Sequence, residues 1–312
     1  MSTESDIREF LASRRAKISP QQAGLPAYGG NRRVPGLRRE EVALLAGVSI
    51  DYYVRLERGR LAGASEEVLD AVAGALQLDE AERAHLYDLA RAAARRPARR
   101  ARRPRGPLPD SVLRVLNSMS DCPAFISNGR LDILAANPLC RALYSPLYTS
   151  GGGQPVMYSP LYTSGGGQPV NIARFQFLDP AGGDFFPHRE EAVNTTVALL
   201  RTEAGRAPGD TELTGLIGEL VTRSDAFRTA WAKHNVRLHY TGRKAFRHPV
   251  VGDITLDFDS MELPAQPGLS LTALSVAPGT PDHDRLQLLA AWAATEEASP
   301  PTGSPASADR QS

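Results

Sequence analysis

The sequence predicts two domains, a helical domain followed by an α+β domain, and three observations support this. Up to residue 94, apolar residues recur at the i, i+3 and i+4 spacing of amphipathic helices. A run with eight arginines and no acidic residue then spans 91–105. From residue 108 onward, stretches that alternate polar and apolar residues lie between helical ones, which indicates strands packed with helices. The expected boundaries are 1–90 and 108–297 for the domains, with a linker at 91–107 and a disordered tail at 298–312.

Five helices are expected in the first domain. The first spans 6–15 and places Ile7, Phe10 and Leu11 on one face. Two lie within 37–59. Another begins after Ser65, a residue type that caps helix N-termini, and the last spans 79–94. Five helices in about ninety residues predict a compact helical domain.

The segment 37–59, LRREEVALLAGVSIDYYVRLERG, predicts two short helices joined by a tight turn. In the first helix we expect Val42, Leu45 and Ala46 to form one buried stripe. Gly47 can adopt the left-handed backbone of a sharp turn without a clash of a Cβ atom.

The second helix of this segment is expected at 50–58, with Ser49 as its N-cap. Its spacing directs Tyr53 and Leu56 toward the first helix. The outer face then consists of Ser49, Ile50, Asp51, Tyr52, Arg55 and Arg58.

Two amphipathic helices with a small residue in the turn and a basic outer face are typical of helix-turn-helix DNA binding. The alternative is an ordinary αα-hairpin, but Ala43 at the crossing and the flanking arginines favour DNA. The start of the second helix would then reach base edges, with Arg55 on a guanine or a phosphate. Asp51 would accept from a cytosine amino group or orient Arg55. Backbone phosphates would be contacted by Arg32, Arg33, Arg38, Arg39 and Arg58.

Charge is distributed unevenly along the chain. The whole chain has a formal net charge of +1, but residues 1–106 carry +6 and the remainder carries −5. A basic front part and an acidic rear part suit a DNA-binding module joined to a domain that does not contact DNA. The arginine-rich linker either adds phosphate contacts or is a solvated connector, and we favour the connector.

The sequence is that expected of a cytoplasmic protein. The polar residues after Met1 show no secretory signal, and no run of 18 apolar residues predicts a membrane span. The two cysteines, Cys122 and Cys140, are expected to be reduced in that compartment.

The second domain is expected to begin with a helix at 110–118, a hairpin that turns at Asn128-Gly129 and a helix from Pro138. The elements expected after these are helices at 188–204, 211–223, 224–233 and 281–295 and strands at 237–240, 244–248, 253–260 and 269–276. In the third of these strands, Asp257, Asp259 and Glu262 are expected on a wet face and Leu256, Phe258 and Met261 on a buried one.

Two copies of a 14-residue segment follow one another at 144–157 and 158–171, identical except at the last residue. Their Gly/Pro-rich composition leaves no apolar face that could stack as a solenoid unit. We interpret them as a tandem duplication that lengthens a surface loop, with a functional lid as the alternative.

Catalytic and cofactor motifs are absent from the sequence. The histidines lack metal-ligand spacing and neighbouring cysteines. Neither a P-loop nor Gly-x-Ser-x-Gly or Gly-x-Gly-x-x-Gly occurs, and the GGG segments lack a strand–helix context. We therefore expect no enzyme activity, no cofactor and no metal.

Several segments resemble a known family of regulators. RREEVALLAGVSIDYYVRLERGR and VLDAVAGALQLDEAERAHLYDLA resemble actinobacterial XRE-family regulators with a lambda-repressor-like DNA-binding head. LDILAANPLCRALYSPLY, NIARFQFLDP, FFPHREEAVNTTVALLRTEAGR and FRHPVVGDITLDFDSMELP resemble the MmyB-like ligand-binding domain, which has a PAS-like fold. The resemblance covers most of residues 7–289. It implies a transcriptional regulator that binds a DNA operator and a small hydrophobic ligand, with fatty acids among the known possibilities.

A PAS-like sheet covered by helices can enclose an apolar pocket with a few polar anchors. The apolar candidates are Phe125, Ile133, Phe175, Phe177, Phe186, Trp231, Val236 and Phe246, each of which can instead be ordinary core. The candidates for holding a carboxylate are Arg174, His188 and Arg247. We expect a homodimer on a two-fold operator. The alternatives for the rear domain are an enzyme and a dimerisation or partner-binding module without ligand.

Overall fold

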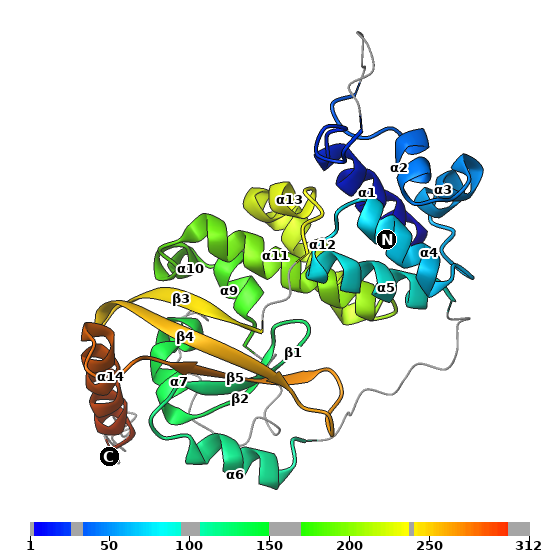
Figure 1. The fold of residues 1–312 in the computed structure, drawn as a ribbon. Coiled ribbons are helices and arrows are strands. Elements are labelled where there is room, and N and C mark those ends of the chain that lie inside the picture. Colours follow the sequence, from blue (N-terminus) through cyan, green and yellow to red (C-terminus); the bar gives the residue numbers. More distant parts are fainter. Residues whose placement is uncertain (1–2, 26–33, 95–106, 150–169, 237–239, 299–312) are drawn as a thin grey trace, which may run out of the picture.

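Five helices form the N-terminal part of the computed structural model, as the apolar spacing predicts (Figure 1). The structure describes residues 3–25, 34–94, 107–149, 170–236 and 240–298. Phe10, Val42 and Tyr53 lie in the shared core of these helices, which we call the helical domain. Its helices are α1 (Thr3–Lys17), α2 (Arg39–Leu45), α3 (Ile50–Glu57), α4 (Glu66–Ala75) and α5 (Glu80–Ala94).

One residue of the predicted stripe on α2 was assigned to the wrong side. Leu45 is 37% exposed, whereas Val42, Ala43 and Ala46 are buried. Both sets of residues satisfy helical spacing, since an apolar helix offers more than one stripe. The packing of α2 against α3 and α4 selects the stripe that contains Ala43.

The remaining elements form the sheet domain, built on one antiparallel sheet with the strand order β2-β1-β5-β4-β3 (Figure 1). The strands are β1 (Ala124–Asn128), β2 (Ile133–Ala136), β3 (Thr241–His248), β4 (Gly252–Glu262) and β5 (Leu269–Ser275). The helices are α6 (Asp110–Ser118), α7 (Pro138–Leu143), α8 (Ser145–Thr149), α9 (Ile172–Leu178), α10 (Pro180–Phe185), α11 (Arg189–Arg206), α12 (Thr211–Arg223), α13 (Asp225–Trp231) and α14 (Pro281–Ala298). The expected α+β composition is therefore observed.

Helices cover both faces of the sheet, and β1 is buried along its whole length. On one face, Leu116 of α6 packs against Ala124 and Ile126. The opposite face meets α7, α10 and α14, where Phe125 and Phe246 lie in a second core. A third core joins α9 with α11, α12 and α13. Alternation of side chains along β1 is what places its residues in two separate cores.

Two local expectations for the sheet are corrected by the structure. The hairpin connects β1 to β2 as predicted, but its turn spans four residues and the positive φ falls on Leu131, at 64°, not on Gly129. Met261 is 47% exposed because the two-residue period of a strand places it on the face of Asp257 and Asp259, opposite Phe258.

The expected helices at 110–118, 188–204, 211–223, 224–233 and 281–295 correspond to α6, α11, α12, α13 and α14. The short helices α8, α9 and α10 were not predicted, since they are too brief to show a full apolar period. No helix of the described residues is long and apolar enough to cross a membrane. Most of the duplicated segment, most of the linker, the tail and most of the expected strand 237–240 lie outside the described residues.

Asn137 joins four backbone groups around the start of α7. Its Oδ1 accepts hydrogen bonds from the backbone N–H groups of Ala124 (3.1 Å) and Cys140 (2.8 Å). Its Nδ2 donates to the carbonyl oxygens of Met119 and Cys122, both at 2.7 Å. Because Asn137 is 1% exposed, water cannot replace these partners.

We predict that Asn137→Ala lowers the free energy of unfolding of the sheet domain by about 3 kcal/mol, because buried backbone groups lose their partners. Urea titration followed by circular dichroism measures this change. Asn117→Ala, at an exposed position on α6, is the matched control and is expected to change it by less than about 0.5 kcal/mol. Equal effects of the two substitutions would contradict the structural role of Asn137.

Candidate nucleic-acid interface and ligand-binding domain

The turn between α2 and α3 has the geometry that the sequence predicts. Gly47 has a φ of +64°, in the left-handed region that glycine adopts without steric cost. The Ser49 hydroxyl accepts a hydrogen bond from the backbone N–H of Tyr52 at 3.2 Å, which caps the start of α3. The turn therefore sets the angle at which α3 leaves α2.

Helix α3 has one buried and one exposed side. Tyr53 and Leu56 are 0% and 2% exposed and lie in the core of the helical domain. Tyr52 is half-buried, and the guanidinium of Arg55 lies over its ring, 4.9 Å from the centroid. The exposed residues of the predicted outer face are Ser49, Ile50, Asp51, Arg55 and Arg58. These side chains of α3 are therefore accessible to a binding partner.

Glu57 is a buried acid that sequence reasoning did not identify. Its side chain is 2% exposed, and one oxygen accepts from Arg15 of α1 at 2.8 Å. The other oxygen pairs with Arg39 at the start of α2, so a single carboxylate connects three helices. The burial of Glu57 could have been inferred from the sequence, because Glu57 lies four residues after Tyr53 and so shares the inner side of α3.

Of the five predicted phosphate contacts, Arg58 is exposed at the end of α3, and the other four fall into three groups. Arg39 uses its Nε atom for Glu57, and this hydrogen bond raises the pKa of the guanidinium, whose side chain stays 53% exposed. Arg38 pairs with Glu40 at 3.3 Å on the surface, and its backbone N–H donates to Glu41. Arg32 and Arg33 lie outside the described residues.

The predicted ligand-contacting residues do not meet in one place. Phe125, Ile133, Phe175, Phe186 and Phe246 belong to the core between the sheet and α7, α10 and α14. Phe177 and Trp231 belong to the core of α9 and α11–α13. Val236 belongs to the core of the helical domain. The sequence predicts that such apolar residues are buried, but it does not predict which of the cores each one joins.

The three predicted anchors for a carboxylate are also separated. Arg174 donates to Glu219 at 2.8 Å, and Arg247 donates to Asp253 at 3.0 Å on the exposed face of the sheet. His188 lines a cleft elsewhere. The two arginines therefore already have carboxylate partners from the protein itself.

An aromatic cluster occupies the core behind β3. The ring centroid of Tyr144 lies 6.0 Å from Phe125, 5.8 Å from Phe185 and 5.5 Å from Phe246. Phe185 in turn lies 5.7 Å from Phe175. Tyr144 and Phe185 are fully buried and were missed, Tyr144 because it begins the duplicated segment and was assigned to a loop.

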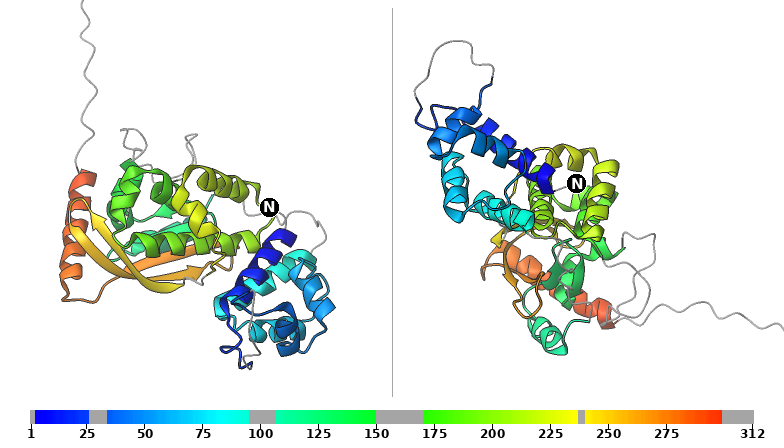
Figure 2. Two further views of the ribbon diagram at one scale, coloured as in Figure 1. Left: turned by 90° about the horizontal axis from the view of Figure 1, so that it is seen from above. Right: turned by 90° about the vertical axis from the view of Figure 1, so that its right-hand side faces the viewer.

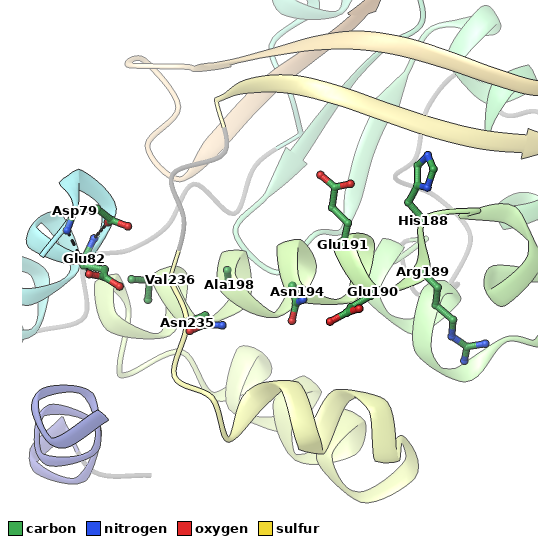
Figure 3. A pocket seen from close by; sticks show the side chains of 10 residues that line it. All are labelled: Asp79, Glu82, His188, Arg189, Glu190, Glu191, Asn194, Ala198, Asn235 and Val236. Atoms are coloured by element: carbon green, nitrogen blue, oxygen red, sulfur yellow. Dashed lines mark hydrogen bonds between the residues drawn. The ribbon is translucent and has the colours of Figure 1, made fainter. Parts of the chain in front are cut away.

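A cleft of about 770 Å³ lies where the two domains meet (Figure 3). Asp79 and Glu82 line it from the helical domain, and Asn235 from the sheet domain. Val236, one of the predicted apolar contacts, also lines the cleft. The rest of the wall comes from the N-cap of α11 and its first turns, namely His188, Arg189, Glu190, Glu191, Asn194 and Ala198. The polar lining makes this cleft unsuited to the apolar ligand that the sequence predicts.

The helical domain packs on α11 and on residues 234–236 of the sheet domain (Figures 1 and 2). At Gly205 a Cβ atom would lie 2.7 Å from Cε1 of His85, so only glycine permits this approach of α11 to α5. Arg14 of α1 donates to the carbonyl oxygen of His234, and Lys17 donates to Asn235 at 2.9 Å. These contacts fix the two domains relative to each other.

Charged groups surround this interface. Arg201 is 4% exposed, stacks on Trp231 at 3.9 Å and contacts Nδ1 of His234 at 2.9 Å. Burial lowers the pKa of Arg201 to about 10, so it remains protonated at neutral pH. At the edge, Arg206 pairs with Asp88 of α5 at 3.3 Å.

Among the described residues, no group of three or more His, Cys, Asp or Glu side chains could hold a metal ion. Cys122 and Cys140 are free thiols.

A capped helix with an exposed polar side, joined to a separate α+β domain, is typical of helix-turn-helix regulators that carry an attached ligand-binding domain. Comparison with family models agrees: residues 8–86 match a helix-turn-helix domain, and residues 108–289 match the MmyB-like transcription regulator ligand binding domain. The chain therefore belongs to the MmyB-like transcription regulator family. No curated protein matched the chain.

We predict a histidine-dependent loss of stability in acid, since burial lowers the pKa of His85 to about 3 from the 6.5 of a free side chain. Below pH 6.5 the unfolded chain binds a proton that the folded chain excludes, so stability is full above pH 6.5 and falls as the pH decreases toward 3. From pH 7.5 to pH 5.0, His85 should account for about 2 kcal/mol of this loss.

Urea unfolding at both pH values, compared between the wild type and His85→Gln, measures this contribution. The variant should lose about 2 kcal/mol less than the wild type over this interval. His188→Gln, which removes an exposed histidine, is the control and should retain the wild-type loss. An unchanged pH dependence in His85→Gln would show that His85 can be protonated in the folded protein.

Proposed function

We propose that this protein is a sequence-specific transcriptional regulator whose helical domain reads an operator through α3 and whose sheet domain senses a small hydrophobic ligand, a fatty acid being one example. The observation that carries the DNA-binding part is the two-sided α3, with Tyr53 and Leu56 buried and a polar, basic face open to solvent. The proposed domains are 1–90, of lambda-repressor type, and 108–297, of PAS type, connected by 91–107 and followed by the tail 298–312.

In this proposal α3 lies in the major groove, and its first turn reaches the base edges. Arg55 is exposed and is held over Tyr52, so its guanidinium leaves the helix in a defined direction. Arg38 and Arg39 at the start of α2, with Arg58 after α3, contact backbone phosphates. Two copies of the chain bind a two-fold operator, each supplying one α3. We propose that the protein acts in the cytoplasm, where the free thiols of Cys122 and Cys140 stay reduced.

We predict that Arg55→Ala weakens binding to the operator by about 1–3 kcal/mol, because a base or phosphate contact is lost. The operator is first selected from randomised DNA, and the affinity is measured by fluorescence anisotropy at fixed salt. Arg228→Ala, an exposed arginine of α13 in the sheet domain, is the matched control with the same change of charge. Equal affinities for the wild type and Arg55→Ala would remove Arg55 from the interface.

The sensor part is supported by the family and by the core between the sheet, α7 and α10, which is lined by aromatic rings. A thermal-shift screen of amphiphiles on the whole chain tests it, and native mass spectrometry of the chain gives the bound mass. Stabilisation by an apolar compound supports sensing. A chain that carries no compound and responds to none would instead support a dimerisation or partner-binding module.

Helix α11 is the element through which we propose that the ligand acts on DNA binding. Val197 and Leu200 of α11 are buried in the sheet domain, whereas Arg201, Gly205 and Arg206 meet α1, α5 and the residues 234–236. A ligand that favours one position of α11 would shift the population of domain arrangements by its difference in affinity for them.

We predict that Asp88→Arg and Arg206→Glu each weaken the contact between α5 and α11, because like charges then face each other across it. The double substitution restores an attractive pair, with a coupling energy of about 0.5–1 kcal/mol in the double-mutant cycle. Hydrogen exchange of the backbone amides in α5 and α11 measures the opening of this contact. Single variants that exchange as slowly as the wild type would contradict the role of this pair.

A further inference from the structure

Ile50 is an exposed apolar residue at the first position of α3. It is 46% exposed, and its neighbours Ser49 and Asp51 are exposed polar residues. All of α3 lies within the described residues, and Ile50 is its only exposed large apolar side chain. The helix lies on the part of the helical domain remote from the sheet (Figures 1 and 2). Ile50 is therefore available to an external partner that has an apolar group of its own.

The first turn of α3 holds Ile50 in a defined position. The hydroxyl of Ser49 accepts a hydrogen bond from the backbone N–H of Tyr52 at 3.2 Å, and its carbonyl oxygen accepts from the backbone N–H of Tyr53 at 3.0 Å. The side chain of Tyr53 anchors the same turn in the core of the helical domain. A β-branched side chain in a helix has one strongly preferred χ1 rotamer. Ile50 therefore loses little conformational freedom when it binds a partner.

The position of Ile50 determines the kind of group that it can contact. In a helix-turn-helix protein, the first turn of the second helix reaches the base edges in the major groove. Among the groups by which the major groove distinguishes base pairs, the C5 methyl group of thymine is apolar, and the others are hydrogen-bond donors or acceptors. An isoleucine placed over a donor or acceptor displaces its water and returns no hydrogen bond, which is unfavourable. Contact with a thymine methyl removes two apolar groups from water, which is favourable.

We propose that Ile50 is a specificity-determining residue that selects thymine at one position of the operator by contact with the C5 methyl group. This rests on the proposed function of α3 as the reader of the operator, and it adds the identity of one base and the group that is read. The polar residues of the same outer face, Ser49, Asp51 and Arg55, are left to form hydrogen bonds with other bases or with phosphates.

The test removes the methyl group from the DNA and the apolar side chain from the protein, separately and together. The operator is selected from randomised DNA, and each of its thymines is replaced in turn by deoxyuridine, which lacks only the C5 methyl group. Affinities of the whole chain are measured by fluorescence anisotropy at fixed salt. At one thymine position the replacement should weaken binding by the wild type about 3- to 5-fold, because the burial of one methyl group is lost.

Ile50→Ala should bind the thymine and deoxyuridine forms of the operator with equal affinity at that position, because the side chain that contacts the methyl group is gone. Its binding of the deoxyuridine form shows at the same time that the variant is folded. Leu44→Ala is the matched control, since it removes the same atoms from an exposed side chain of α2, where Leu44 is 72% exposed. This control should keep the wild-type cost of deoxyuridine.

A second comparison places the methyl group on a different base. With 5-methylcytosine at the position of this thymine, the wild type should bind more tightly than with cytosine, by a factor similar to that between thymine and deoxyuridine. Ile50→Ala should not distinguish 5-methylcytosine from cytosine.

Two results would overturn the role of Ile50 and leave DNA binding by α3 in place: a wild type that is indifferent to every thymine methyl group, or a cost of deoxyuridine that persists in Ile50→Ala. If no operator can be selected from randomised DNA, the proposed function itself is wrong, and the role of Ile50 is wrong with it.

Discussion

The arrangement of the whole molecule depends on the close approach of α11 to α5. Gly205 lies against the ring of His85, and a residue with a Cβ atom fits there only if the His85 ring or one of the helices shifts. Arg201, one turn earlier, is buried by the same contact and stacks on Trp231. The position of α11 thus depends both on the steric fit at Gly205 and on the buried cation of Arg201. A movement of α11 would change the Gly205–His85 contact and the Arg201–Trp231 contact together. Packed interfaces shift between discrete arrangements and do not deform continuously.

A comparable constraint operates inside the helical domain at Glu57. Its carboxylate is buried between Arg15 and Arg39, so removal of either arginine would leave one of its two oxygens buried without a partner. The end of α3 is thereby tied to the start of α2 and to α1. The exposed face of α3 depends on this buried pairing, since the orientation of Arg55 follows from the orientation of the helix that carries it.

The sheet domain separates its charges by strand face. Arg243 and Arg247 are exposed and paired across to β4, where such surface pairs contribute little to stability. Lys244 is on the other face, with its Nζ atom 4.7 Å from the ring centroid of Phe258. A two-residue period thus produces two kinds of cation within five positions, one paired with aspartates of β4 and one placed against the ring of Phe258. Neighbouring residues of β3 such as Arg243 and Lys244 therefore have different surroundings, because they lie on opposite faces of the strand.

The sequence by itself determined the local elements: the helical periods of the first domain, the turn at Gly47, the cap at Ser49 and the inward side of α3 at Tyr53 and Leu56. These follow from backbone geometry and the spacing of apolar residues, which are properties of a few neighbouring positions. Only the tertiary structure decided that Leu45 is exposed, that Val236 belongs to the core of the other domain and that the predicted ligand contacts occupy separate cores. It also decided that Arg14 meets the backbone of His234, 220 positions away in the chain. Such contacts depend on how completed elements pack, and no local pattern encodes which buried side chain will meet which.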